Sequence, residues 1–191
     1  TLTKYGYEDG QLPKEFYFSS MADWDGMLLV ASSDGELIGV DTETGKVRWK
    51  DRYMIEHGGK TSEAYNIVVD PEGNYWVMTN LKTFVYDQKA RQWHPSVNSF
   101  LEAHGIAPLP DPLQIWDVMA DKRGWIWIGT DHEGVFVIDP KSKEVKQLLN
   151  NKFDETSLSD NTIRHLMTDH SGNVWISGYR NGLNQYIENL S

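Results

Sequence analysis

The sequence contains side chains with the chemistry of a small-molecule binding site. Trp116 and Tyr179 combine a flat apolar face with a polar edge, which suits contact with a sugar ring. Arg164 and Arg180 carry forked N–H donors that match carboxylate or sulfate groups, such as those on an acidic sugar. The predicted ligand-binding residues are Trp116, Asp131, His132, Arg164, Tyr179 and Arg180.

These arginines have a second interpretation. In a chain of formal net charge −10, they could instead form ion pairs with neighbouring carboxylates such as Asp160 or Asp131. In that case their donors would be occupied within the protein. The sequence leaves both interpretations open.

No catalytic, metal or cofactor site is predicted. The six histidines are scattered without an HExxH or other metal-ligand spacing, and no Gly-x-Ser-x-Gly elbow occurs. No segment has the series of oxygen ligands that a calcium loop requires. The absence of cysteine excludes thiol nucleophiles, disulfides and cysteine-based zinc sites. We therefore expect no catalytic residues, no metal and no cofactor in this chain.

The elements that would position the ligand-binding residues are repeats. The tetrad Asp-x-x-Gly recurs at intervals of about 50 residues, and a large apolar residue stands three residues after each glycine. The copies are Asp23–Gly26, Asp70–Gly73, Asp121–Gly124 and Asp169–Gly172. Repetition with this period indicates a β-propeller with one blade per repeat.

Each part of the repeat has a structural interpretation. The predicted strands before the tetrads are Phe16–Ala22, Tyr65–Val69, Ile115–Ala120 and Ile163–Thr168. The aspartate accepts hydrogen bonds from the turn and the glycine supplies a positive φ. Trp76, Trp127 and Trp175 share one repeat position, so they are predicted to pack between blades. The predicted fold is all-β, with propeller blades of four antiparallel strands.

The approximate repeats are 9–56, 57–106, 107–157 and 158–191, and residues 1–8 resemble the outer strand of a preceding blade. The stretch Gln88–Gln114 is expected to be irregular apart from a short helix at Ser96–His104. The start, Thr1–Lys4, has neither an initiator methionine nor a signal-peptide core, so we expect an excised or mature segment. We favour a segment of a larger propeller over a closed four-bladed ring. Such a segment would expose blade faces and self-associate, for example as a homodimer.

Propeller geometry places the six predicted residues together. The first strand of each blade lines the channel, the Asp-x-x-Gly turns lie at one end, and the loops after the tryptophan strands lie at the other. All six residues fall at this second end, where two arginines are the strongest local attraction for an anion in an acidic chain.

The bulk composition excludes some partners. A net charge of −10 disfavours binding to nucleic acid and to anionic membranes. No run of 18 apolar residues occurs, so we expect no membrane span in this segment.

Two stretches, Ile115–Thr130 and Ser157–Leu183, resemble the two-component regulator propeller repeat. They share its Asp-x-x-Gly-x-x-Trp-Ile core, followed in the second stretch by Gly182-Leu183, and the resemblance extends over Tyr65–Tyr186. It implies the periplasmic sensor region of a Bacteroides-type hybrid histidine kinase and response regulator in the inner membrane. Such sensors respond to glycans or oligosaccharides and control polysaccharide-utilisation genes.

The first repeat supports a different class of protein. Its segment Asp25–Trp49 resembles a blade of the quinoprotein family, which implies a quinoprotein-like or lyase-like propeller enzyme. A third alternative is a scaffold propeller that binds proteins.

Overall fold

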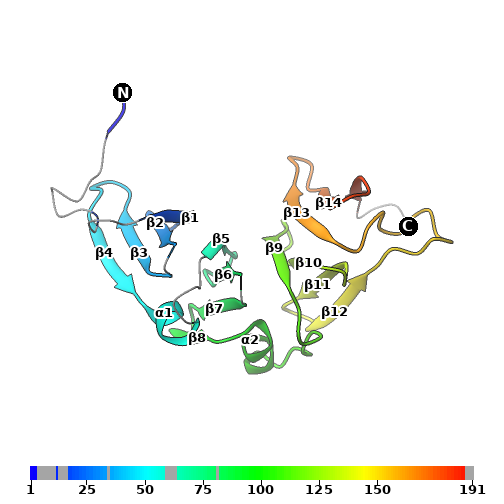
Figure 1. Ribbon diagram of the computed structural model, residues 1–191, viewed down its shortest axis with the longest axis horizontal. Coiled ribbons are helices and arrows are strands. Elements are labelled where there is room, and N and C mark those ends of the chain that lie inside the picture. The colour runs from blue at the N-terminus through cyan, green and yellow to red at the C-terminus, as the bar shows by residue number, and fades with distance from the viewer. Residues whose placement is uncertain (4–11, 13–16, 34, 59–63, 81, 188–191) are drawn as a thin grey trace. The chain divides into compact units, whose positions relative to one another are not determined.

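The computed structural model describes residues 1–3, 12, 17–33, 35–58, 64–80 and 82–187. The strands of these residues form antiparallel sheets in which neighbours in sequence are also neighbours in the sheet (Figure 1). The chain divides into two compact units, Thr1–Pro95 and Ser96–Ser191. The predicted outer strand at residues 1–8 falls mostly outside the described residues.

The first unit contains two four-stranded sheets. The first sheet comprises β1 (Phe18–Trp24), β2 (Met27–Ser32), β3 (Leu37–Asp41) and β4 (Val47–Asp51). After α1 (Tyr53–Gly58), the second comprises β5 (Ala64–Val69), β6 (Tyr75–Thr79), β7 (Thr83–Asp87) and β8 (Gln92–His94). Buried Leu29 and Leu37 from the first sheet and Ile67 and Phe84 from the second belong to one hydrophobic core.

The second unit begins with α2 (Val97–Ala103). Its four-stranded sheet comprises β9 (Ile115–Ala120), β10 (Ile126–Thr130), β11 (Val135–Asp139) and β12 (Glu144–Leu148). A second sheet contains three described strands, β13 (Ile163–Thr168), β14 (Val174–Gly178) and β15 (Leu183–Tyr186). Trp127, Val135, Ile163 and Leu166 are buried in a core that both sheets share. The prediction of all-β propeller blades with four antiparallel strands is confirmed.

The predicted turn aspartates are confirmed in three repeats. Oδ1 of Asp70 accepts hydrogen bonds from the backbone N–H groups of Glu72 and Asn74, both at 3.0 Å. Oδ2 accepts a bond from Nε1 of Trp76 at 3.0 Å. Asp121 and Asp169 repeat this arrangement with Trp127 and Trp175. Each aspartate therefore ties its turn to the tryptophan of the next strand, a bond that the sequence did not predict.

The first copy of the tetrad is different, and its assignment to the same turn is wrong. Asp23 lies within β1, opposite Leu28, and the chain reverses at Asp25 and Gly26. Their φ angles of 48° and 74° are those of a two-residue hairpin turn. Leu29 stands where the other repeats have tryptophan, so no indole N–H is present there to bind an aspartate.

The predicted helix is confirmed. α2 spans Val97–Ala103, and the side chain of its N-cap Ser96 accepts a hydrogen bond from the backbone of Ser99. Gly105, with a φ of +67°, follows the helix. The expected irregularity of Gln88–Gln114 is only partly correct, because this stretch also contains β8 and places Trp93 on a strand. Among the helices of the described residues, none is long and apolar enough to cross a membrane.

Gly129 on β10 allows the two sheets of the second unit to approach closely. A Cβ atom at this position would lie only 2.8 Å from Cγ2 of Ile163 on β13. We therefore expect Gly129→Ala to lower the free energy of unfolding by about 1–3 kcal/mol, measured by urea denaturation. If the contact is the cause, Ile163→Ala should partly relieve the effect in the double variant. Strictly additive effects of the two substitutions would contradict this explanation.

Candidate ligand-binding site

The first strand of successive blades contains a bulge near its start. The register of β9 against β10 shifts at Trp116, and that of β13 against β14 shifts at Arg164. The same shift occurs at Tyr65 in β5. A β-bulge inserts one extra residue and redirects the local side chains. Trp116 and Arg164 therefore share a structural position as well as a repeat position.

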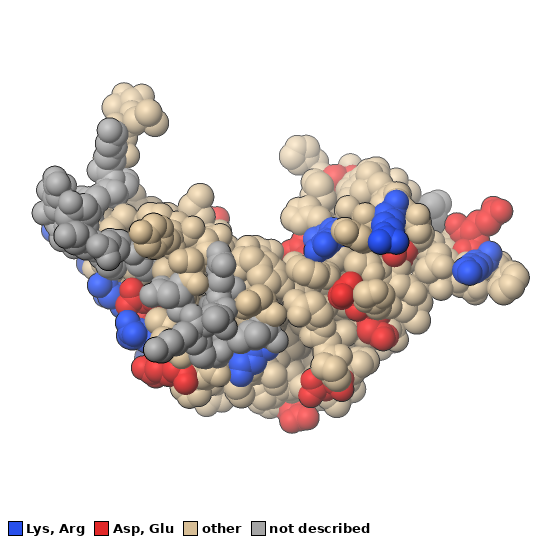
Figure 2. All heavy atoms as spheres, in the orientation of Figure 1, with Lys and Arg blue, Asp and Glu red and all other residues tan. Residues whose placement is uncertain are grey.

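Four of the six predicted residues come together in the second unit. The guanidinium carbon Cζ of Arg164 lies 4.2 Å from the ring centroid of Trp116 and 4.6 Å from that of Tyr179. The Cζ atom of Arg180 lies 5.6 Å from the Tyr179 ring. We call these residues the arginine–aromatic cluster. Figure 2 shows basic side chains on the surface over β13 and β14, among neutral and acidic ones.

Backbone hydrogen bonds fix the loop after β14 that carries Tyr179 and Arg180. Oδ2 of Asp160 accepts bonds from the N–H groups of Arg180 at 3.0 Å and Asn181 at 3.3 Å, and Oδ1 accepts one from Thr162. These donors, with the Arg180 N–H first, hold the pKa of Asp160 below its ordinary value. The N–H of Tyr179 donates to the Thr162 carbonyl at 2.8 Å. The loop is therefore preorganised without using either guanidinium.

Within the described residues, Asp160 and Asp131 do not form the ion pairs with the arginines that the second interpretation expects. The Asp160 carboxylate binds backbone N–H groups, and Asp131 pairs with His132 across 3.0 Å. Among the described residues, no carboxylate lies within ion-pair distance of Arg164 or Arg180. Their N–H donors can therefore reach a ligand.

Asp131 and His132 lie in the loop after β10 and contact each other. The N–H of Asp131 donates to the Gln114 carbonyl, as Tyr179 does to Thr162 in the next repeat. His132 adopts a φ of +75° and its side chain is 80% exposed. No hydrogen bond or ion pair between described residues joins this pair to the arginine–aromatic cluster, so their predicted role remains a prediction.

Sequence reasoning missed the residue that joins the strands beneath the cluster. Asp117 is buried next to Trp116, and its Oδ2 accepts a hydrogen bond from the Leu166 N–H at 2.8 Å. The same oxygen lies 2.7 Å from Nδ1 of His165. These contacts hold β9 against β13, and with them Trp116 and Arg164. A carboxylate within an otherwise apolar strand was the signal that could have identified this role.

The cluster has the chemistry of an anion receptor. A guanidinium stays protonated at neutral pH, and when it lies over aromatic rings its N–H groups still point outward in its plane. Those groups can donate two parallel bonds to a carboxylate or sulfate. Because Arg164 covers part of the Trp116 and Tyr179 faces, the expected stacking of a sugar on these faces is less favoured than contact with the guanidinium edge. Within the described residues, no group of three or more His, Cys, Asp or Glu could hold a metal ion.

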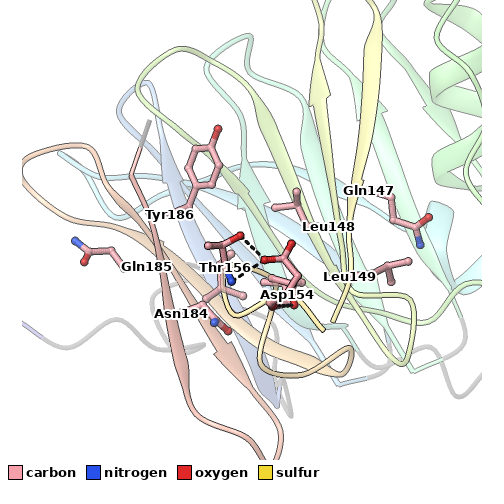
Figure 3. Close-up of a pocket in the computed structure, with 11 residues that line it drawn as sticks. Gln147, Leu148, Leu149, Asp154, Thr156, Asn184, Gln185 and Tyr186 are labelled. Atoms are coloured by element: carbon pink, nitrogen blue, oxygen red, sulfur yellow. Dashed lines mark hydrogen bonds between the residues drawn. The ribbon is translucent and has the colours of Figure 1, made fainter. Parts of the chain in front are cut away.

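A groove of about 360 Å³ lies elsewhere in the second unit (Figure 3). Its lining includes Leu148 from β12, Asp154 and Thr156 from the following loop, and Tyr186 from β15. Asp154 accepts bonds from the hydroxyl and from the backbone N–H of Thr156, which lower the pKa of its carboxyl. Because these polar groups already bind one another, the groove is a weaker candidate than the arginine–aromatic cluster.

Comparisons with known proteins agree with this fold. The model of the two-component regulator propeller family matches residues 108–132 and 157–180, which contain all six predicted site residues. The extracellular domain of the hybrid two-component system BT3049 from B. thetaiotaomicron is 20% identical, with a TM-score of 0.62. That similarity covers 96% of this chain and 22% of the other. A search of curated proteins found no match.

Two further solved structures share the fold. The extracellular domain of the hybrid two-component system BT4673 from B. thetaiotaomicron is 16% identical over 88% of this chain and 27% of that chain, with a TM-score of 0.52. The β-propeller domain of Cps50 (Swd1) from Myceliophteria thermophila is 14% identical over 91% of this chain and 53% of that chain, with a TM-score of 0.59. The chain thus spans about a quarter of the length of the two Bacteroides domains. Two segments of it match the two-component regulator propeller model, on blades that share the fold of extracellular domains from Bacteroides hybrid two-component systems.

Proposed function

We propose that this chain is part of the periplasmic sensor propeller of a hybrid two-component system and binds an acidic oligosaccharide. The observation that carries the proposal is the arginine–aromatic cluster, whose two guanidinium groups have no carboxylate of the described residues within ion-pair distance. The cluster lies on the repeats that match the regulator family. In the whole protein, occupancy of this site would be relayed to a histidine kinase and would control the transcription of glycan-utilisation genes.

The binding partner follows from the donors. Two neighbouring guanidinium groups favour an anionic group, and their planar N–H edges favour the paired oxygens of a uronate carboxylate or a sulfate ester. Because the side chains of Tyr179 and Arg180 are exposed, salt should screen the attraction and weaken binding.

Calorimetric titration with oligogalacturonate and with chondroitin sulfate oligosaccharides tests this proposal. We expect at least one of them to bind saturably, and Arg164→Ala to weaken that binding about tenfold or more. Arg164→Lys should also weaken it, since lysine keeps the charge but loses the planar fork.

The matched control is Lys141→Ala. Lys141 is an exposed cation in the turn between β11 and β12, at the opposite end of the sheet from the loop after β10. This variant should bind like the unmodified chain. The proposal is wrong if neither acidic ligand binds, or if Lys141→Ala weakens binding as much as Arg164→Ala does.

A further inference from the structure

A candidate modification site lies in the loop after β14, beside the arginine–aromatic cluster. Asn181 and Gly182 form the only Asn-Gly pair in the sequence. Both residues are exposed, and Gly182 directly precedes β15. Asparagine is a thermally labile residue, because the nitrogen of the following peptide group can attack its side-chain amide. Glycine has no Cβ atom, so it hinders this attack less than any other residue.

The two groups that would react are the side-chain amide of Asn181 and the backbone N–H of Gly182. In the described part of the chain, neither group makes a hydrogen bond. Other asparagines differ, because their side-chain amides donate hydrogen bonds; these are Asn74, Asn98, Asn150 and Asn173. Each of those four has to break a bond before its amide can react, whereas Asn181 does not.

A neighbouring hydroxyl group favours the first step of the reaction. The Ser159 hydroxyl donates a hydrogen bond to the carbonyl oxygen of Asn181, which belongs to the same peptide group as the Gly182 nitrogen. A donor on this oxygen stabilises the negative charge that the peptide group acquires when its nitrogen loses a proton. The N–H of Asn181 donates to Oδ2 of Asp160 at 3.3 Å, which fixes the backbone before the reacting groups and leaves the groups themselves accessible.

We propose that Asn181 deamidates spontaneously and that the new carboxylate lowers the affinity of the arginine–aromatic cluster for anions. Hydroxide removes the amide proton of Gly182, and the nitrogen then forms a bond to Cγ of Asn181. The bond between Cγ and Nδ2 breaks, and the leaving nitrogen takes up a proton from water and departs as ammonia. Water next adds to the cyclic succinimide. Cleavage between Cγ and the ring nitrogen gives aspartate, and cleavage between the backbone carbonyl carbon and the ring nitrogen gives isoaspartate.

The product changes the charge of the cluster. It places a carboxylate next to Arg180 in sequence, on the loop whose Tyr179 ring contacts the guanidinium of Arg164. This carboxylate competes with an anionic ligand for the guanidinium donors, and it repels the ligand. The effect on binding rests on the proposed function, whereas the modification itself does not. Deamidation would make the site lose affinity irreversibly with the age of the protein.

Peptide mass spectrometry of the 191-residue chain, incubated in warm and mildly alkaline buffer, tests the modification. We expect OH to replace NH2 at Asn181, at a rate within about tenfold of that in the chain unfolded by guanidinium chloride, since the exposed pair reacts without unfolding. Asn74 and Asn98 should stay intact, and Asn181→Gln should show no change at this position. The proposal is overturned if Asn181 stays intact in the folded chain while it reacts in the unfolded one, or if Asn74 or Asn98 reacts as fast.

Calorimetric titration with oligogalacturonate and with chondroitin sulfate oligosaccharides tests the effect on binding. Asn181→Asp should weaken the binding of the acidic ligand about threefold or more. The unmodified chain should lose affinity during the incubation, whereas Asn181→Gln should keep its starting affinity. Equal affinities of Asn181→Asp and the fresh unmodified chain would overturn the effect on the cluster. If neither ligand binds the fresh chain, the proposed function fails and this effect fails with it, while the mass measurement still decides the modification.

Discussion

Replacing Trp127 with alanine is expected to lower the free energy of unfolding by about 3–5 kcal/mol. The Trp127 side chain is 1% exposed in the core of the second unit, and its ring meets Tyr186 with centroids 5.1 Å apart. Its indole N–H donates to Oδ2 of Asp121 at 2.9 Å. The substitution therefore creates a cavity and also removes a partner from a buried carboxylate. Urea denaturation monitored by circular dichroism measures the loss.

Trp175→Ala is the matched control. Trp175 occupies the same repeat position and donates to Asp169 at 3.0 Å, but it is only half-buried. Less apolar area is removed from water around Trp175, so its loss should cost clearly less. Equal denaturation midpoints for Trp127→Ala and Trp175→Ala would show that burial between the sheets does not determine the effect.

The blades could be predicted from the sequence because the repeat encodes them locally. The strands Ile115–Ala120 and Ile163–Thr168 have the predicted bounds, since each is a short apolar run that ends at a turn aspartate. The helix after Ser96 was also predicted from local sequence signals, namely a capping serine at its start and Gly105 beyond its end. Where the turn residues and the apolar pattern agreed, the element was predicted correctly.

The turn and the strand that were predicted wrongly also have local causes. In the first repeat, the Asp25-Gly26 pair forms a tight hairpin by itself, which leaves Asp23 inside a strand. Around Trp93, prolines suggested an irregular stretch, yet the three residues Gln92–His94 pair with β7. Trp93 then stacks on Tyr53 and bonds to Asp51, so it belongs to the packing of the first unit.

The candidate sites depended on contacts that no short pattern contains. The sequence placed Arg164 and Tyr179 at one end of the blades, but their contact depends on the bulge at the start of β13 and on Asp160 holding the loop. The contact between the rings of Trp49 and Tyr75 was not predicted, because these residues lie in different repeats and their rings meet only when two sheets pack.

Asp121→Ala should have the second large effect on stability, lowering the free energy of unfolding by about 3 kcal/mol. Asp121 is 6% exposed, and its carboxylate accepts bonds from the backbone N–H groups of Arg123 and Trp125. It also binds the indole of Trp127 and the guanidinium of Arg123. Removal of the carboxylate leaves the buried indole N–H without its acceptor. Because the two residues are bonded, Asp121→Ala and Trp127→Ala together should cost less than the sum of the single effects.

The contribution of Asp121 should also depend on pH. Burial by itself would raise the pKa of the Asp121 carboxyl, but the donors from Arg123, Trp127 and Trp125 outweigh it and lower the pKa. A carboxylate with a lowered pKa in the folded state stabilises the fold above its unfolded pKa, and this stabilisation is lost as pH falls through the folded pKa. The stability difference between the unmodified chain and Asp121→Ala should therefore be constant near neutrality and shrink below about pH 4. Urea midpoints measured across this range test the direction, and a difference that widens with acidification would show that the carboxylate is not stabilised in its charged form.

Asp169→Ala, at the equivalent half-buried turn, is the control, because the donors of Asn173 and Trp175 lower the pKa of Asp169 to about 2. The stability difference between the unmodified chain and Asp169→Ala should persist down to about pH 4 and then decline toward pH 2.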